Sequence, residues 1–189
     1  MRKIILVFVA LAFSLNAFSQ LESDRWYLSF GVNAVNSLGT RSPINSPSEW
    51  AFKKAPVSIA AELIWSKYFS IEQSIAFNEF DSSKTIDGAN LTESYNYLAF
   101  DTSVKYYYGR FIFPDFEWID LYVNGGLGIF SIDNINTSLN VGAGVLFWLN
   151  DDQNFGIRAQ TIAKAALNHS ESGFNNNHFQ WHLQAIIKL

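Results

Sequence analysis

The sequence predicts an all-β protein, an eight-stranded antiparallel up-and-down transmembrane β-barrel. Two observations predict it. Eight segments alternate apolar residues with polar or small ones, and the connections between these segments alternate in length. A period of two is typical of strands with two unlike faces. Long loops at one rim with shorter turns at the other are typical of outer-membrane barrels.

Residues 1–19 are expected to be a signal peptide and residues 20–189 the barrel domain. Arg2 and Lys3 precede an apolar run over 4–13 that is too short to span a bilayer. Ala17-Phe18-Ser19 then has the small-x-small pattern of a cleavage site. A membrane anchor or a core helix is the alternative interpretation of this segment. The signal peptide predicts that the chain is exported.

The composition argues against several classes of protein. The chain has no cysteine, so its fold does not rely on disulfides or Cys-ligated metals. The formal net charge of −4 becomes −6 when Arg2 and Lys3 are removed, which argues against a nucleic-acid partner. No apolar segment of about 20 residues follows the signal peptide, so a transmembrane helix is not expected.

The first four predicted strands are 26–35, 57–66, 69–80 and 96–108. In the first two, every second residue is apolar, beginning at Trp26 and at Val57. In the third and fourth, the apolar face is interrupted once each, by Gln73 and by Thr102. A helical period fits these segments less well than a period of two.

The last four predicted strands are 118–130, 139–150, 155–165 and 178–189. The sixth strand of the barrel, LNVGAGVLFWLN, places Leu139, Val141 and Val145 on one face and Gly142 and Gly144 on the other. Glycine inside several of these segments penalises a helix. Each segment therefore favours a strand.

The connections predict which ends of the strands lie together. The longer ones are 36–56, 81–95 and 167–177, and the shorter ones are 66–68, 109–117, 131–136 and 150–154. Long loops then lie mostly at one rim and turns at the other, which places both termini at the turn end, in the periplasm.

The volumes of the side chains predict which face meets lipid. An eight-stranded barrel has an interior just wide enough for its own side chains. The polar face carries many small residues, namely Ser29, Gly31, Ser58, Ala60, Ser74, Ala76, Gly126, Gly128, Gly142, Gly144 and Gly156. The other face carries mostly Trp, Phe, Leu, Ile and Val, which would overfill that interior, so we expect it to face lipid. A soluble lipocalin-like binder is the alternative for a barrel of eight strands.

Six charged residues fall on the face predicted to point inward. They are Glu62, Glu72, Asp101, Lys105, Arg158 and Lys164. We expect them to form an ion-pair network, because a buried charge without a partner is costly. The up-and-down topology places four of them in the periplasmic half of the lumen. A largely plugged, static lumen is the first interpretation, and a gate for small solutes is the alternative.

The first long connection holds the candidates for surface contacts. Trp50 and Phe52 lie beside Lys53 and Lys54. Exposed aromatic and basic side chains suit contact with lipopolysaccharide phosphates or with a partner protein. The alternative is that the two rings pack over the rim of the barrel.

We expect no catalytic, metal or cofactor site. His178 and His182 are four residues apart, which on a strand separates them by about 13 Å, too far to share a metal. The segment NHSES, residues 168–172, contains histidine, serine and glutamate in a polar loop, but it has no recognised nucleophile signature.

Four stretches of the chain resemble the OmpA-like β-barrel proteins of Bacteroidetes and flavobacteria. They are WYLSFGVNAVNSLGT (26–40), YVNGGLGIFSIDN (122–134), GVLFWLNDDQNFGIRAQT (144–161) and NNHFQWHLQAIIKL (176–189). The resemblance implies an eight-stranded barrel in the outer membrane. Larger relatives append a peptidoglycan-binding domain, and we expect this chain to be the barrel alone.

The expected function is structural: envelope integrity, with loops available for surface contacts. The expected partners are outer-membrane lipid and lipopolysaccharide, with a protein partner as a further possibility. One alternative is an accessory subunit of a larger outer-membrane secretion or assembly complex. Another is a barrel enzyme that modifies lipid A.

Overall fold

The computed structural model describes residues 26–36, 44, 50–52, 56–82, 85–86, 89–90, 93–132, 134–167 and 177–189. The predicted signal peptide, residues 1–19, lies outside the described residues. Lys53, Lys54 and the segment 168–172 lie outside them as well. Within the described residues, no helix is both long enough and apolar enough to cross a membrane.

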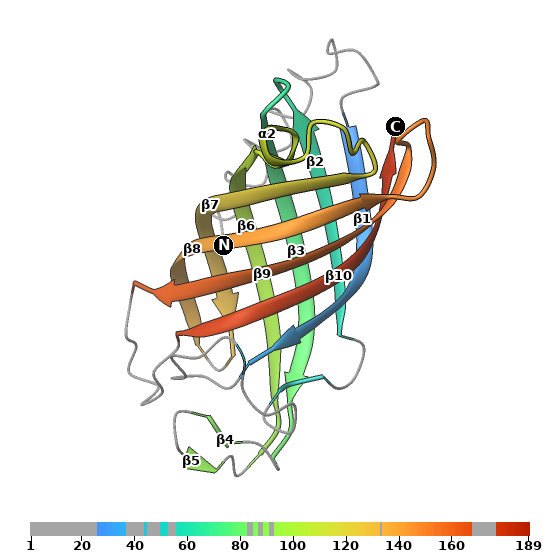
Figure 1. Ribbon diagram of the computed structural model, residues 1–189. Coiled ribbons are helices and arrows are strands. Elements are labelled where there is room, and N and C mark those ends of the chain that lie inside the picture. Colours follow the sequence, from blue (N-terminus) through green and yellow to red (C-terminus); the bar gives the residue numbers. More distant parts are fainter. Residues whose placement is uncertain are drawn as a thin grey trace.

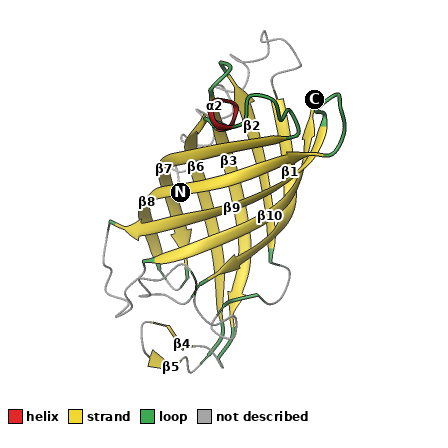
Figure 2. Cartoon of the chain, in the orientation of Figure 1, coloured by secondary structure: helices red, strands yellow, loops and turns green. Residues whose placement is uncertain are grey.

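Eight strands close into one antiparallel barrel (Figures 1 and 2), which confirms the predicted fold class. They are β1 (Trp26–Val35), β2 (Val57–Ile64), β3 (Phe69–Phe80), β6 (Tyr95–Tyr107), β7 (Ile119–Ser131), β8 (Ile135–Trp148), β9 (Phe155–Ala166) and β10 (His178–Lys188). Each strand pairs with its neighbours in chain order, apart from a short two-stranded sheet, β4 (Thr85–Ile86) with β5 (Ala89–Asn90), between β3 and β6.

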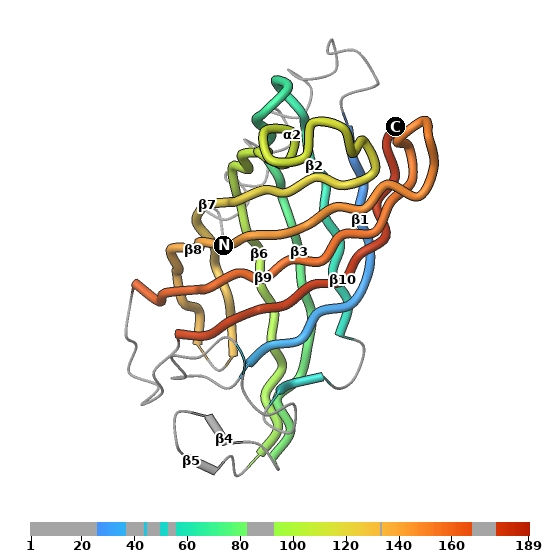
Figure 3. The backbone as a smooth tube through the Cα atoms, in the orientation of Figure 1, coloured from blue at the N-terminus to red at the C-terminus, as the bar shows by residue number. Residues whose placement is uncertain are grey.

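The barrel closes where the first strand meets the last. β1 pairs antiparallel with β10, with Phe30 opposite Ala185 and Val32 opposite Leu183. Figure 3 shows this seam as the blue end of the chain lying beside the red end. Closure pairs the backbone groups of every strand and leaves no sheet edge, which a lipid environment requires.

The rims differ as the connection lengths predict. The helical turn α2 (Gly109–Ile112) and the carboxyl terminus lie at one rim, which we call the turn end (Figure 1). The β4–β5 sheet lies at the other rim, which we call the loop end.

The predicted start of the sixth barrel strand at residue 139 was wrong. β8 begins at Ile135, because the alternation continues backward through Asn136 and Ser138, which are both buried.

The two faces of the wall have the predicted orientation. Val141 is 60% exposed and Leu183 55%, whereas Glu72 and Lys105 are buried inside the barrel. Bulky apolar side chains therefore form the outer surface, and charged and small residues fill the interior. A band of this kind is what an outer-membrane barrel presents to hydrocarbon.

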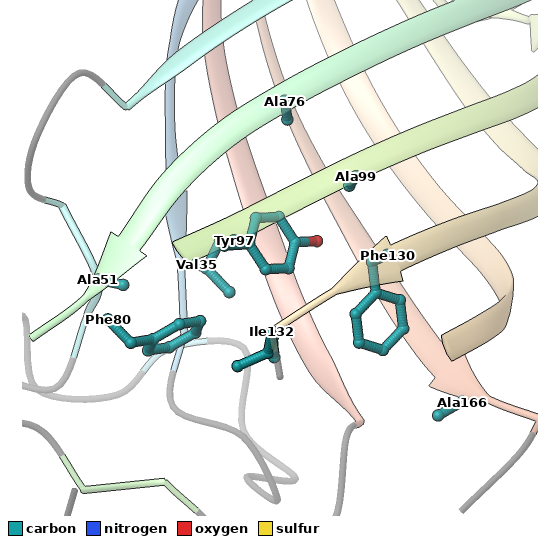
Figure 4. Close-up of a cluster of buried hydrophobic side chains, with 9 residues drawn as sticks. All are labelled: Val35, Ala51, Ala76, Phe80, Tyr97, Ala99, Phe130, Ile132 and Ala166. Atoms are coloured by element: carbon teal, nitrogen blue, oxygen red, sulfur yellow. The ribbon is translucent and has the colours of Figure 1, made fainter. Parts of the chain in front are cut away.

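Apolar side chains form a packed cluster near each end of the barrel. At the loop end, Val35, Phe80, Tyr97 and Phe130 pack with Ile132 inside the barrel (Figure 4). At the turn end, Leu146, Trp148 and Ile186 pack against Tyr27. A cavity of about 60 Å³ at the turn end is lined in part by Tyr27, Leu146 and Trp148. The polar interior thus lies between two apolar layers.

Replacing Gly126 with alanine should destabilise the barrel by about 1–3 kcal/mol, the usual cost of forcing atoms into a packed site. A Cβ at Gly126 would lie 2.0 Å from the backbone oxygen of Thr102 on the neighbouring strand. The adjacent Gly125 is the matched control, because a Cβ there would lie 3.9 Å from its nearest neighbour, the backbone oxygen of Asn140. Urea unfolding of both variants measures the difference, and equal midpoints would contradict the close approach.

Candidate functional site

Four charged side chains from four strands meet inside the barrel, and we call them the charge quartet: Glu62 on β2, Glu72 on β3, Lys105 on β6 and Arg158 on β9. Lys105 Nζ lies 2.9 Å from Glu62 Oε2 and 2.6 Å from Glu72 Oε2. Arg158 Nη2 lies 2.6 Å from Glu62 Oε2, and Nη1 of the same guanidinium is paired with Glu72 Oε2. Each cation bridges both carboxylates, so the charge quartet is neutral overall.

The register explains why these four side chains meet. Glu62 and Glu72 are direct cross-strand partners, an arrangement that is destabilising for like charges unless cations lie between them. Lys105 stands on β6, the other neighbour of β3. Arg158 stands on β9, which pairs with neither β2 nor β3, so its guanidinium reaches the carboxylates across the interior.

Two hydroxyl groups complete the hydrogen bonds of one carboxylate. Ser70 Oγ donates to Glu62 Oε1 at 2.6 Å, and the Tyr107 hydroxyl donates to the same oxygen at 2.5 Å. A buried carboxylate is tolerated when both cations and hydrogen-bond donors surround it. Glu62 therefore has its charge balanced and its oxygens occupied in the folded state.

An aromatic ring lies against both cations. The Tyr122 ring centroid is 4.8 Å from Lys105 Nζ and 5.9 Å from Arg158 Cζ, which places the ring within cation–π range. Gly144 makes room for this ring, because a Cβ at that position would lie 2.4 Å from it. Tyr107 and Tyr122 were missed from the sequence. The period of two could have placed both rings on the inward face, because Tyr107 follows Lys105 by two residues and Tyr122 precedes Asn124 by two.

A second ion pair lies apart from the charge quartet. Lys164 Nζ is 2.6 Å from Asp101 Oδ2 and 2.9 Å from Oδ1. Asn140 Nδ2 donates to Asp101 Oδ1 at 2.8 Å, and Ser138 Oγ donates to Asn140 Oδ1 at 2.7 Å. The structure thus brings the six predicted charged residues together as one group of four and one of two, rather than as a single continuous network.

Buried polar side chains lie near these two groups. His182 stands opposite Gln160, which lies between Arg158 and Lys164 along β9. The two ring nitrogens of His182 and both polar side-chain atoms of Asn124 make no hydrogen bond within the described part of the chain. Buried polar atoms of this kind are ordinarily satisfied by ordered water.

The other histidine of β10 has a different environment. His178 Nε2 lies 2.9 Å from the Tyr97 hydroxyl, in the apolar layer at the loop end. Among the residues that the structure describes, no group of three or more His, Asp or Glu side chains is placed to hold a metal ion.

The predicted loop contacts are only partly within the described residues. Trp50 stacks on the Trp181 ring with centroids 6.1 Å apart and an angle of 13° between the ring planes. The next residue, Ala51, forms an isolated β-bridge with Val35. Trp50 therefore packs against the barrel wall, whereas Phe52 is 55% exposed.

Comparisons with known proteins agree with this architecture. Residues 5–185 match the family described as outer membrane protein beta-barrel domain. Neisserial surface protein A is a similar solved structure, with a TM-score of 0.61 and 12% identity over 88% of this chain and 98% of that one. The amino-terminal barrel domain of Pseudomonas aeruginosa OprF has a TM-score of 0.54 and 13% identity over 88% and 98%.

A third similar structure is Ail, the attachment invasion locus protein of Yersinia pestis. It has a TM-score of 0.50 and 16% identity, covering 89% of this chain and 100% of that one. At these identities the solved structures show the fold alone. No curated protein sequence matches the chain. The family match covers nearly the whole sequence, and the chain belongs to the outer-membrane β-barrel domain family, whose place is the bacterial outer membrane.

Proposed function

We propose that this outer-membrane barrel has a structural, non-catalytic role in the envelope. In this proposal residues 1–19 are removed as a signal peptide, residues 20–189 form the barrel, and both termini lie in the periplasm. The lumen is closed, and the loop end offers a surface for lipopolysaccharide or a protein partner. The relationship to the OmpA-like proteins of Bacteroidetes is part of the same proposal.

The charge quartet is the observation that carries this proposal. Lys105 and Arg158 bridge Glu62 and Glu72 across the interior, so the ion pairs tie opposite walls of the barrel together. An eight-stranded barrel leaves little interior beyond its own side chains. With apolar layers at both ends of the lumen, this arrangement supports a stabilising core rather than a wide solute path.

The loop end is the proposed surface for contacts. Phe52 is exposed there, beside Trp50, which packs on the wall. Lys53 and Lys54 follow in the sequence and supply positive charge. Exposed rings next to basic side chains suit the phosphates of lipopolysaccharide.

The closed lumen predicts that the purified barrel does not conduct. Reconstituted into planar bilayers, the protein should give no stable open-channel current, and vesicles containing it should not swell in small sugars. A sixteen-stranded porin serves as the positive control for both assays, since such barrels leave an aqueous channel. Steady conductance, or swelling like that of the porin, would contradict the closed lumen.

A further inference from the structure

The connection between β6 and β7, residues 108–118, exposes an unusual number of large apolar side chains. Phe111 is 61% exposed, Ile112 55%, Phe116 49% and Trp118 53%. These residues lie outside the barrel strands, in α2 and the segment that follows it at the turn end (Figure 1). Large apolar side chains gathered in this way mark a surface that something else covers.

Ring contacts join this connection to the outer surface of the barrel. Phe116 packs on Trp118 with centroids 6.1 Å apart, and Trp118 stacks on Phe147 at 6.0 Å. Phe147 lies on the outward face of β8, in register with Ile157 of β9. On the other side, Phe111 stacks on Tyr68 of the β2–β3 turn at 5.1 Å. The exposed rings therefore continue the apolar outer band at its turn-end edge.

The charged side chains of the connection fall in two places. Asp115 and Glu117 line one pocket together with Trp118. Arg110 lines the cavity at the mouth of the lumen, together with Lys67 and Asp120. Phe111 and Ile112, the next residues of α2, do not line that cavity and are exposed. The helical turn thus has a charged side toward the lumen mouth and an apolar side away from it.

We propose that the β6–β7 connection lies in the interfacial layer of the bilayer at the turn end. Phe111, Ile112, Phe116 and Trp118 insert among glycerophospholipid headgroups and the adjoining acyl carbons. Phospholipid is the occupant because the patch is continuous with the lipid-facing band and rich in aromatic rings, which favour the headgroup level. The inference rests on the proposed membrane placement of the barrel, and it adds a segment outside the strands to the membrane-bound surface.

Single cysteines can test this placement cleanly, because the chain has none of its own. Phe111→Cys and Phe116→Cys are labelled with an environment-sensitive fluorophore in phospholipid nanodiscs that hold one barrel each. Asp115→Cys, an exposed polar position in the same connection, is the matched control, and Val141→Cys reports the hydrocarbon core. Ile112→Cys replaces any variant whose unheated gel migration shows that it has not folded.

The labels at 111 and 116 should be quenched several-fold less by aqueous iodide than the label at 115. A lipid spin label near the headgroup end of the acyl chain should quench the labels at 111 and 116 most strongly. A lipid spin label near the methyl end of the acyl chain should quench the label at 141 most strongly. This inference would be overturned if iodide quenched the labels at 111 and 116 as strongly as the label at 115. If lipid spin labels still quenched the label at 141, the membrane placement of the barrel itself would stand. Iodide access at 141 would overturn the membrane placement itself. Protection found only when several barrels share a vesicle would assign the patch to a second copy and contradict phospholipid.

Discussion

Replacing Arg158 with methionine is expected to lower the free energy of unfolding by about 3–5 kcal/mol, the range for breaking a buried ion pair. The variant removes the guanidinium that pairs with both Glu62 and Glu72. Two buried carboxylates would then share Lys105, leaving a net negative charge in the lumen. Urea unfolding followed by tryptophan fluorescence, in phospholipid vesicles, measures the loss as a lower midpoint.

Two further variants separate lost charge balance from lost packing. Arg110→Met removes an exposed arginine at the turn end and should leave the midpoint nearly unchanged. The double variant Arg158→Met with Glu72→Gln leaves one carboxylate facing one lysine, so it should recover much of the stability lost by Arg158→Met. The double variant should therefore lose less stability than the two single variants lose together, as is expected for residues of one network. An Arg158→Met variant that unfolds with the parent would refute the stabilising role of the charge quartet.

The sequence predicts the barrel well because alternation is a local property. Each strand shows its two faces within a few residues, so the inward position of Lys105 and the outward position of Val141 follow from their neighbours. The same logic extends β8 back to Ile135, and the error at its start came from ending the pattern too early. The inward orientation of Tyr122 could be predicted in the same way, from its spacing of two residues from Asn124.

The partners of the inward charges are less accessible to such reasoning. Arg158 and Glu62 are 96 residues apart and stand on strands that do not pair. Their contact depends on how the closed sheet twists and how far each side chain reaches, which no local pattern records. The same limit explains why Asp101 and Lys164 form a separate pair.

The β6–β7 connection shows a different limit. The sequence predicts a connection over 109–117, yet α2 occupies Gly109–Ile112, and a helical turn of four residues is too short to show a period. The exposure of Phe111 and Phe116 depends on which sides of the connection face the barrel. That arrangement is set by contacts with residues distant in sequence: Phe111 stacks on Tyr68 of the β2–β3 turn, and Trp118 at the end of the connection stacks on Phe147 of β8.

Placing arginine at Val141 is expected to destabilise the barrel by about 2–4 kcal/mol in a phospholipid bilayer, the cost of a cation at the midplane of the lipid face. Val141 lies at the middle of β8 and is 60% exposed on the outer surface. Leu149→Arg is the matched control, because Leu149 is similarly exposed but follows the turn end of β8, where the cost should be about 0–1 kcal/mol.

The comparison between these two sites tests what the outer face contacts. A surface that faces water would accept arginine at either position with little change, since exposed substitutions usually alter stability by less than about 0.5 kcal/mol. Only a hydrocarbon layer makes the cost depend on depth along the strand. Urea midpoints in the same vesicles therefore measure depth directly, and equal midpoints for Val141→Arg and Leu149→Arg would place the apolar face of β8 outside the membrane.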